Sequence, residues 1–560
     1  MDITPIEGLK ITLNGTVNNN ENHYTYAQQS FYGFGAQNYK GGYIYKENNQ
    51  YYSVNFQQII NYTRDFGKHN MSLMVGHENY NYETQTLGGD RNNMFSFFQS
   101  QDLDSAITFL SNNSSSSKYN TEGFFFRGMY NYDERYFFSA SYRRDASSRF
   151  HPDHRWGNFY SIGGAWILTK EEWLSADWLN MLKLKASWGQ QGNDAIGDFR
   201  YTDTYEVSNT GGELGFVQAT VGNPKITWET NSNYNAGFEF ELFKSRLTGS
   251  VEYFYRKTTD MLSYVLMPFS AGYGGSYDNV GDMSNKGIEI DLNWHIFRQQ
   301  NFNWSVNLNA THYVNKVLKL NEDNRGNILD GHAGYANGSH FVGEGLPLYT
   351  WMLRKYAGVN DEGQALYYVQ KDGQLTTTTS YTAASYFNCG DPHPDLYGGF
   401  GTTLSFMGFD FSIGLNYSIG GKAFDYGYQT LMGNPQMGMT GSSYHKDLLN
   451  AWSEDNRNSN IPRFQLAEQN SDLSSNYASD RFLTNASSLT LHNVNIGYTL
   501  PRQLTSKAGL GKVRIYASGE NLYYWSKRKG FDPRNSFSGE ATANTYAPIR
   551  TISGGINIQF

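Results

Sequence analysis

The residue types that most often perform covalent chemistry do not occur here at the spacings that such chemistry needs. The 12 histidines are scattered, no HExxH or GxSxG motif is present, and Cys389 is the single cysteine. One cysteine supplies neither an internal disulfide nor a thiolate zinc site. Residues 321–332 have part of a calcium-loop pattern, but Arg325 takes a ligand position and His332 the place of the bidentate glutamate. The sequence therefore favours a protein with no catalytic residues, no metal site and no cofactor.

Charged side chains recur instead at alternate positions of segments whose other positions are apolar. Five of them stand between aromatic or aliphatic neighbours: Arg143, Glu239, Glu241, Glu252 and Asp291. Successive side chains of an extended strand point to opposite faces. If the strands close into a barrel, these five are the candidates for its polar, lumen-facing wall. They either solvate a lumen or select a substrate. We favour the first interpretation, because every barrel with a wet interior needs a polar inner wall.

The same alternation predicts sixteen strands along the chain. The clearest lie at 124–132, 136–143, 234–242, 247–256, 288–296, 302–310 and 409–417. Each runs for about ten residues with Tyr, Phe or Trp near its ends, which suits a strand tilted across a bilayer between aromatic girdles. Strands of soluble sandwiches and propellers are commonly about five or six residues long. The sequence thus predicts an all-β protein, a transmembrane antiparallel β-barrel.

Short and long connections are expected to alternate, as do the periplasmic turns and extracellular loops of bacterial barrels. Tight turns are predicted near 65–69, 133–134, 243–246, 297–301 and 407–408, with somewhat longer ones near 169–178 and 501–511. Long loops are predicted near 18–50, 81–118, 191–230, 258–285, 315–394, 420–484 and 525–547. These loops are rich in aromatic residues, Asn and Gly, which suits sugar or peptide contacts and equally suits girdles and interfaces.

Two local features refine this expectation. In the strand at 487–500 the apolar parity changes after Leu491, which predicts a β-bulge at His492–Asn493. The pair His77–Glu78 is expected at a strand end, as a polar rim pair rather than a metal site.

The chain ends on a strand of the same kind. Ile556, Ile558 and Phe560 share one parity, and Asn557 and Gln559 the other. Alternation that ends on an aromatic C-terminal residue is typical of the last strand of an outer-membrane barrel. We therefore expect Ile556, Ile558 and Phe560 to form the signal for the barrel assembly machinery.

Composition excludes other classes of protein. The mean hydropathy is −0.61, and no apolar run reaches the roughly 18 residues that a transmembrane helix needs. The net charge is −8 and the acidic and basic residues are interspersed, so nucleic acid is not an expected partner. The N-terminal residues MDITPIEGLK lack the apolar core of a signal peptide. We expect that a signal was removed or that a front part is missing.

Motifs along the chain resemble the SusC/RagA family of TonB-linked outer-membrane transporters of Bacteroidetes. In order they are HNMSLMVGHE (69–78), ERYFFSASYRRDASSRF (134–150), RWGNFYSIGGAW (155–166), LKLKASWGQQGN (182–193), NPKITWETNSNYNAGFEF (223–240), RLTGSVEYFYRKTTDML (246–262), NVGDMSNKGIEIDL (279–292), GDPHPDLYGGF (390–400), IPRF (461–464), SSLTLHNVNIGYTLP (487–501) and RIYASGENLYYWSKRKGFDP (514–533). No single motif is decisive, but their order and spacing together are specific. The stretch 342–358 follows the family pattern loosely.

The resemblance implies a 22-stranded barrel that is filled by an N-terminal plug. The sixteen predicted strands fit strands 7 to 22 of that barrel. Residues 1–560 are then one TonB-dependent transporter β-barrel domain, from which the signal peptide, the TonB box and the plug are absent.

The implied function is outer-membrane import of oligosaccharides or peptides, with no covalent bond made or broken. The partners that the resemblance implies are outer-membrane lipid, a SusD-like surface lipoprotein that covers the loops, and the TonB complex, which acts through an N-terminal region not in this chain. Loops 315–394 and 420–484 are expected to form much of the lipoprotein contact, because long loops are usually functional. The alternative is a passive pore or a non-transporting barrel remnant, left after loss of the plug. An outer-membrane enzyme is less favoured than either.

Overall fold

The computed structural model describes residues 1–30, 41–267, 270, 272–433, 443–465, 477–541 and 546–560. The chain divides into two compact units. The first contains 1–165, 187–232 and 259–280, and the second contains 166–186, 233–258 and 281–560. Among the described residues, seventeen strands belong to one large sheet, which confirms the all-β, antiparallel prediction. The number of strands is one higher than predicted, because Asp2–Ile6 forms β1 and pairs with the strand that follows it.

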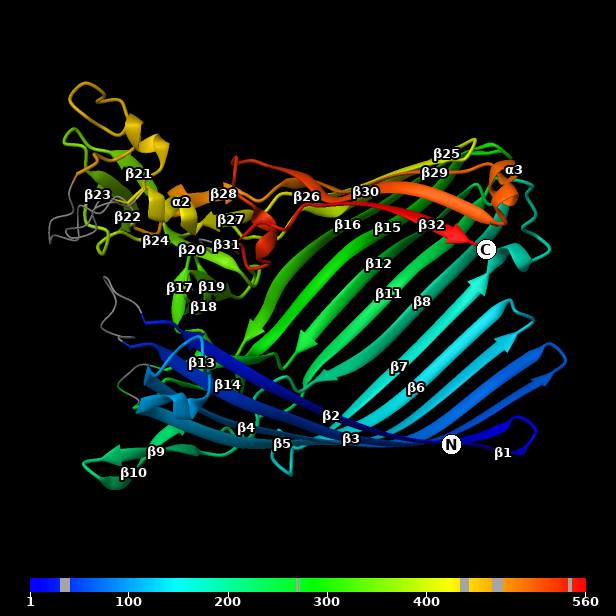
Figure 1. Ribbon diagram of the computed structural model, residues 1–560, viewed down its shortest axis with the longest axis horizontal. Helices are drawn as coiled ribbons and strands as arrows, with labels where there is room; N and C mark the ends of the chain where they lie inside the picture. The colour runs from blue at the N-terminus through cyan, green and yellow to red at the C-terminus, as the bar shows by residue number, and fades with distance from the viewer. Residues whose placement is uncertain (31–40, 268–269, 271, 434–442, 466–476, 542–545) are drawn as a thin grey trace. The chain divides into compact units, whose positions relative to one another are not determined.

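In the first unit, four neighbouring strands are much longer than the predicted ten residues. They are β2 (Leu9–Gln28), β3 (Tyr43–Phe66), β4 (His69–Met94) and β5 (Ala106–Tyr132), and they pair in sequence order (Figure 1). At about 3.3 Å per residue, β4 is on the order of 85 Å long. The hydrocarbon core of a bilayer is about 30 Å thick. These strands are therefore longer than a bilayer crossing requires.

The loops predicted at 18–50 and 81–118 are thus largely wrong, because strand pairing continues through much of both segments. Residues 31–40 of the first loop lie outside the described residues. The segments are polar, rich in Asn, Ser and Thr, so hydropathy alone predicts loops. Cross-strand rings support the ladder: Tyr24 meets Tyr45, and Tyr26 meets Tyr43, at centroid distances of 6.1 and 6.0 Å. His77 and Glu78 consequently lie inside β4 and not at a strand end.

Smaller elements complete the first unit. After β5 come β6 (Tyr136–Ser147) and β7 (Trp156–Ile167). The predicted long connections 191–230 and 258–285 hold two hairpins, β9 (Thr204–Thr210) with β10 (Glu213–Thr220) and β13 (Leu262–Leu266) with β14 (Gly275–Asn279). Residues 268, 269 and 271 of the second connection lie outside the described residues. Strands β7, β8 (Leu179–Asn193) and β11 (Glu229–Leu242) have residues in both units.

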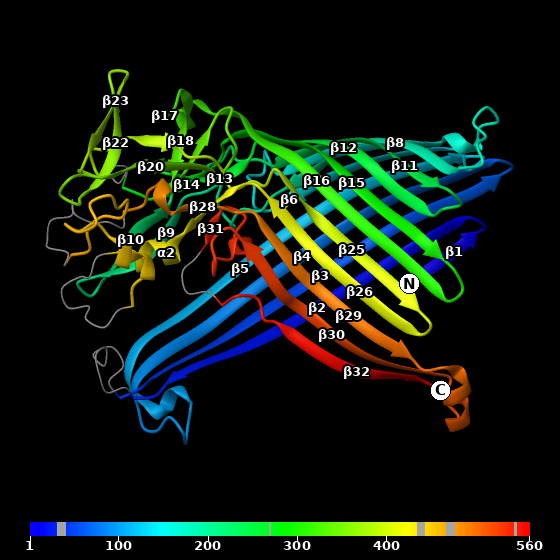
Figure 2. The same cartoon turned by 90° about the horizontal axis from the view of Figure 1, so that it is seen from above.

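In the second unit, eight of the described strands form one continuous ladder (Figure 2). In ladder order they are β12 (Leu247–Thr259), β15 (Gly281–Arg298), β16 (Phe302–Leu320), β25 (Leu396–Phe406), β26 (Phe409–Ile419), β29 (Ser488–Thr499), β30 (Lys512–Ser526) and β32 (Thr551–Gln559). Every neighbouring pair in this series is antiparallel.

The predicted tight turns are confirmed by their backbone geometry. At the β25–β26 turn, Met407 and Gly408 both have positive φ angles, 47° and 91°, and in the first unit Asp133 and Glu134 at the β5–β6 turn have φ angles of 53° and 49°. Positive φ at both central residues is the mark of a two-residue type I′ hairpin, whose twist matches that of the strands.

The predicted bulge in β29 is also confirmed. Gly414 of β26 pairs with Asn493, and the next residue, Leu415, pairs with Leu491, so His492 is skipped in the β26 register. The extra residue moves the apolar positions from Leu491 to Val494, which keeps them on one face of the sheet.

At the end of the ladder opposite the tight turns, the long connections fold into small sheets (Figure 2). One sheet contains β17 (Asn327–Leu329), β18 (His332–Asn337), β19 (His340–Gly343), β20 (Thr350–Arg354) and β24 (Tyr386–Asn388); a second contains β21 (Tyr356–Val359), β22 (Ala365–Lys371) and β23 (Gln374–Thr378); a third contains β27 (Lys422–Asp425), β28 (Leu483–Asn485) and β31 (Glu540–Ala541). A short helix, α2 (Tyr426–Leu431), follows β27. The described helices include none long and apolar enough to cross a membrane.

These connections share a hydrophobic core, which we call the loop core. Its buried residues are Trp351, Leu353, Phe387, Cys389, Phe424, Met432 and Phe482. They come from the separately predicted loops 315–394 and 420–484, and β31 from loop 525–547 pairs with β27 beside them. The predicted loops are therefore real connections with a packed interior. Residues 434–442, 466–476 and 542–545 of these loops lie outside the described residues.

The register of β15 predicts which of its side chains meet lipid. Ile290 lies between Val251 and Ala310, whereas Asp291 lies between Ser250 and Asn309. We expect a membrane-impermeant thiol reagent to label an Asp291→Cys variant more strongly than an Ile290→Cys variant. Ile290→Arg is expected to destabilise the protein by about 2–4 kcal/mol if the residue lies near the bilayer midplane. Stronger aqueous labelling at position 290 would show that the two faces are assigned the wrong way round.

The loop core should loosen at acidic pH because of His340. This side chain is 6% exposed, its ring lies tilted against the Trp351 ring at a centroid distance of 4.2 Å, and it contacts the Ser538 carbonyl at 3.0 Å. Burial lowers the pKa of His340 below its usual range, against the opposing influence of Glu540 and the Ser538 carbonyl. The folded loop therefore favours neutral His340. Its stabilising contribution is complete above the unfolded pKa of about 6.5 and is lost as the pH falls from there towards the folded pKa.

Hydrogen exchange of residues 340–354, corrected for the intrinsic rate, measures this effect. Exchange should be faster at about pH 5.5 than at about pH 7.5. A His340→Gln variant keeps an N–H donor for Ser538 but does not titrate in this range. If that variant shows the same dependence on pH, His340 is not the responsible group.

Candidate functional site

Two of the five predicted wall residues, Glu239 and Glu252, form one cluster in the second unit. Lys185 of β8 contacts Glu239 of β11 at 3.1 Å and Glu252 of β12 at 2.7 Å, and Lys183 contacts Glu239 at 3.2 Å. The neighbouring residues of opposite parity, such as Phe238 and Tyr253, are exposed apolar side chains. The cluster shows that this face of the three strands is polar and that the opposite face is apolar.

The other three predicted wall residues are not part of that cluster. Arg143, in the first unit, contacts Asp145 at 2.7 Å and Glu78 at 3.1 Å. Glu241 accepts a hydrogen bond from Ser245 at the β11–β12 turn, at 2.7 Å. Asp291 accepts one from the Asn293 amide at 2.9 Å. Arg143 and Asp291 have polar partners on their own face of the sheet, and Glu241 has one in the adjoining turn. The lumen-facing role of all three residues remains a prediction.

The C-terminal residues have the predicted alternation. Ile556 pairs with Ile515 and Ile558 with Val513 of β30, and Phe560 lies beyond the end of β32, 92% exposed. Whether the assembly machinery reads these residues remains a prediction.

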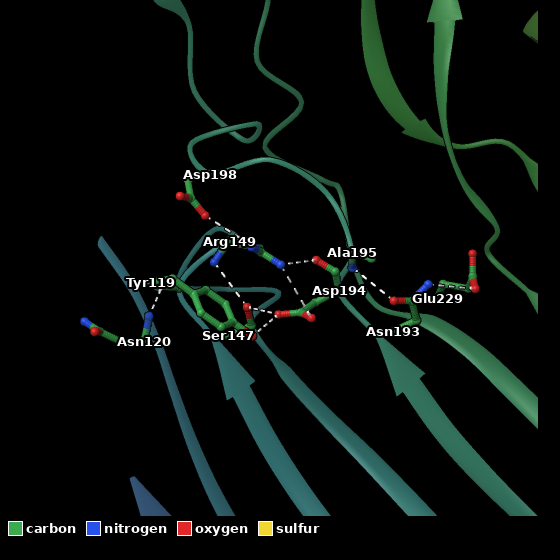
Figure 3. Close-up of polar contacts among 10 residues, drawn as sticks. Tyr119, Asn120, Ser147, Arg149, Asn193, Asp194, Ala195, Asp198 and Glu229 are labelled. Carbon is green, nitrogen blue, oxygen red and sulfur yellow. Dashed lines mark hydrogen bonds and ion pairs between the residues drawn. The ribbon is translucent and has the colours of Figure 1, made fainter. Parts of the chain in front are cut away.

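Sequence reasoning missed a polar network around Arg149 in the first unit (Figure 3). The Arg149 guanidinium lies 4.2 Å from the ring centre of Tyr119 and donates hydrogen bonds to the Asp198 carboxylate, at 3.1 Å, and the Asp194 carbonyl, at 3.2 Å. Tyr119 and Ser147 both donate to the Asp194 carboxylate, at 2.7 and 2.6 Å. Since its charges are paired, we interpret the network as a fastening of residues 194–198 onto β5 and β6.

The feature best suited to hold a ligand is a cavity of about 740 Å³ in the second unit. We call it the wall pocket. Its floor consists of alternate residues of adjacent strands: Phe254, Arg256, Asn285, Glu289, Asn309, Tyr313, Gly399, Asn416 and Thr490. Its rim is formed by Pro392, His393, Pro394, Pro533, Arg534, Ser536 and Phe537 of two connections. The pocket therefore lies on the polar face of the ladder, where the strands meet the long connections.

The register of the ladder fixes the floor of the wall pocket. Asn309 pairs with Gly399, Gly399 with Asn416, and Asn416 with Thr490, so these residues lie side by side across four strands. The Asn309 side-chain oxygen also accepts the backbone N–H of Gly399 at 2.8 Å. Backbone pairing thus holds the polar groups of the floor in place before any ligand arrives.

One rim segment is attached to the floor by Arg534. Its guanidinium donates to the Thr490 hydroxyl at 3.0 Å and binds both carboxylate oxygens of Asp532, at 2.8 and 2.6 Å. Burial acts to raise the pKa of the Asp532 carboxyl, but the hydrogen bonds from Arg534 outweigh it and keep this pKa below its usual range. Asp532 therefore remains ionised and paired.

Aromatic rings form a chain along the pocket. Phe537 meets Tyr349 edge-on at a centroid distance of 5.4 Å, and Tyr349 lies 6.3 Å from His393. The Tyr313 ring lies edge-on to the rings of His393 and Tyr397, at a centroid distance of 6.0 Å in both cases. Amides, paired charges and ring faces together suit non-covalent recognition of a polar ligand. The described part of the chain contains no group of three or more His, Cys, Asp or Glu side chains suited to a metal ion.

None of the five predicted wall residues lines the wall pocket, although Asn285 and Glu289 belong to the same strand as Asp291. We selected candidates by charge, whereas the pocket is built mainly from amides and rings near the strand ends. A signal was present in the motif GDPHPDLYGGF, which supplies Pro392, His393, Pro394 and Tyr397 to the pocket.

Comparison with known proteins identifies the family. The family model of the TonB dependent receptor-like β-barrel matches residues 4–522. The chain is 27% identical over 533 residues to TonB-dependent receptor P3 of Formosa agariphila, covering 90% of this chain and 52% of that protein. It is 26% identical over 540 residues to TonB-dependent receptor SusC of Bacteroides thetaiotaomicron, covering 91% of this chain and 50% of SusC. The chain thus spans about half the length of these curated relatives.

A solved structure of the RagAB peptide transporter superposes on the whole chain with a TM-score of 0.86 and 27% identity, and the match covers 61% of that transporter chain. The predicted SusC/RagA resemblance and outer-membrane location are therefore confirmed, and the protein belongs to the TonB-dependent receptor family as a member with the outer-membrane β-barrel fold.

Proposed function

We propose that the protein containing this barrel imports a nutrient across the outer membrane, energised by the TonB complex and assisted by a SusD-like surface lipoprotein. The observation that supports this most strongly is the match of the entire chain to the RagAB peptide transporter at a TM-score of 0.86. The substrate is an oligosaccharide or a peptide. TonB acts through a region outside residues 1–560.

The residues of this chain suit such a role without chemistry at a covalent bond. The ladder supplies a wall whose one face is lined by paired charges, such as Arg514 with Asp410. The wall pocket offers a place on that face where a substrate binds reversibly. The loop core holds the connections in one arrangement, because Trp351 and Phe424 are almost fully buried in it. A lipoprotein partner would then dock on a preformed surface, with little ordering cost.

Assembly partners follow from the same fold. We propose that the barrel assembly machinery recognises β32 through Ile556, Ile558 and Phe560, which have exposed fractions of 62%, 49% and 92%. Outer-membrane lipid then contacts the apolar face of the ladder. Large exposed apolar side chains on alternate strand positions are what a lipid-facing surface needs.

Uptake measurements test the proposed import. The full-length protein, in its own outer membrane, should accumulate a labelled substrate only when TonB and the proton gradient are present. Saturable accumulation that is lost in a TonB-deficient strain is the expected result. Nonspecific leakage of small solutes that is equal with and without TonB would contradict active import and favour the passive-pore alternative.

The lipoprotein contact has its own test, designed to leave the loop core intact. Leu375 and Leu449 lie in the two predicted contact loops and are 58% and 89% exposed. Leu375→Glu and Leu449→Glu should weaken co-purification with the lipoprotein, because each places a charge in an apolar contact. Phe98, 80% exposed and outside both loops, supplies the control variant Phe98→Glu. Unchanged co-purification of the double Leu variant would exclude this surface as the contact.

A further inference from the structure

We propose that the wall pocket binds an uncharged pyranose unit of an oligosaccharide and that Phe537 is the residue on which the sugar ring stacks. This inference rests on the proposed import function, because it names the substrate class that the pocket selects. It chooses between the two classes, glycan and peptide, that the family resemblance leaves open.

The first argument is the position of Phe537. It lines the wall pocket, yet it is 81% exposed. A large apolar ring in this position has few protein contacts to give up when a ligand binds, and it gains buried contact area. One face of a pyranose ring presents C–H groups, which the negative face of an aromatic ring attracts. Exposed rings beside a polar pocket therefore suit a sugar, which combines an apolar face with a polar edge.

The second argument is that the segment carrying Phe537 is held in place. Arg534 attaches it to Thr490 on one side, and on the other side the Ser538 carbonyl contacts His340 at 3.0 Å. Gly539 has a positive φ of 79°, and a Cβ there would lie 2.8 Å from the Lys422 carbonyl oxygen and 3.1 Å from Trp351. The backbone on both sides of Phe537 is thus fixed, so the ring is offered at a defined place.

The third argument is the charge balance of the pocket. Its two arginines and its histidine each have a carboxylate partner. Arg256 lies 3.9 Å from Glu289, Arg534 lies 2.6 Å from Asp532, and His393 lies 2.8 Å from Asp391. The described lining residues therefore offer no unbalanced charge for a peptide terminus or an acidic sugar. A neutral ligand leaves these ion pairs in place, whereas a charged one has to compete with them.

The fourth argument concerns the backbone. Peptides often bind by adding a strand to an open sheet edge. The floor strands β15, β25, β26 and β29 each pair on both sides within the ladder, and β16 does so as far as Thr311. Over that paired stretch, the described floor residues present no open sheet edge to the pocket. A ligand on this paired part of the floor is therefore recognised by side chains. The amides of Asn285, Asn309 and Asn416 both donate and accept hydrogen bonds, as sugar hydroxyls do.

Binding measurements on the detergent-solubilised full-length protein test this inference. The probes are fluorescently labelled oligosaccharide pools from partial hydrolysis of starch, laminarin and yeast mannan, and a labelled tryptic peptide pool from casein. We expect saturable binding of at least one neutral oligosaccharide pool and none of the peptide pool. Phe537→Ala should weaken oligosaccharide binding by about tenfold, equivalent to about 1.4 kcal/mol, and Phe537→Tyr should preserve it.

The control variant is Tyr546→Ala, which removes a fully exposed ring that does not line the pocket. It should bind like the unchanged protein. Saturable binding of the peptide pool, binding of no oligosaccharide pool, or equal losses in Phe537→Ala and Tyr546→Ala would each overturn the inference. TonB-dependent uptake of peptides would refute the sugar assignment while leaving the import function standing. Oligosaccharide binding without TonB-dependent uptake would support the sugar assignment and contradict the import function.

Discussion

Backbone N–H and C=O groups cannot be left unpaired in lipid, and this constraint determines how the strands are arranged. In the second unit this constraint is met by a ladder of eight antiparallel strands from β12 to β32, each bonded to the next. Because the strands are committed to pairing, side chains must alternate between two faces. The polar face then holds ion pairs such as Arg514 with Asp410, and the apolar face holds exposed rings such as Tyr253.

Outside the regular ladder, hydrophobic burial and cross-strand contacts stabilise the structure. The connections of the second unit bury Trp351, Phe424 and Phe482 against one another, as a small soluble domain does. The long strands of the first unit continue through polar segments by backbone pairing and rings such as Tyr24 and Tyr45. Both solutions place ordered structure outside the length of strand that a bilayer crossing needs, and such ordered surfaces are suited to recognition.

The alternating pattern explains how much of the fold was predictable. A period of two is local, so it located sixteen of the seventeen sheet strands, the tight turn at Met407–Gly408 and the bulge at His492. It missed β1, which is five residues long and contains Pro5, and it ended β4 too early where the sequence turns polar. The loop core was not predictable, because Trp351 and Phe482 are 131 positions apart and nothing local links them.

The candidate site likewise has a part that was predictable from local sequence and a part that was not. The polar parity of Glu239 and Glu252 was readable from the strands, and the structure brings these two residues together. The wall pocket was not readable, because it needs two distant rim connections around Pro392 and Phe537 to meet over the floor strands. The candidate binding site therefore lies where the period of two ends and long-range packing begins.

We expect one face of each ladder strand to meet lipid and the other to meet water, with the bulge in β29 keeping the faces aligned. Nitroxide labels placed singly from Leu489 to Tyr498, in full-length protein in lipid vesicles, test it directly. We expect high oxygen accessibility at Leu489 and Leu491 and then at Val494, Ile496 and Tyr498, a shift of one position at His492. An unbroken period of two through His492, or no periodicity at all, would contradict it.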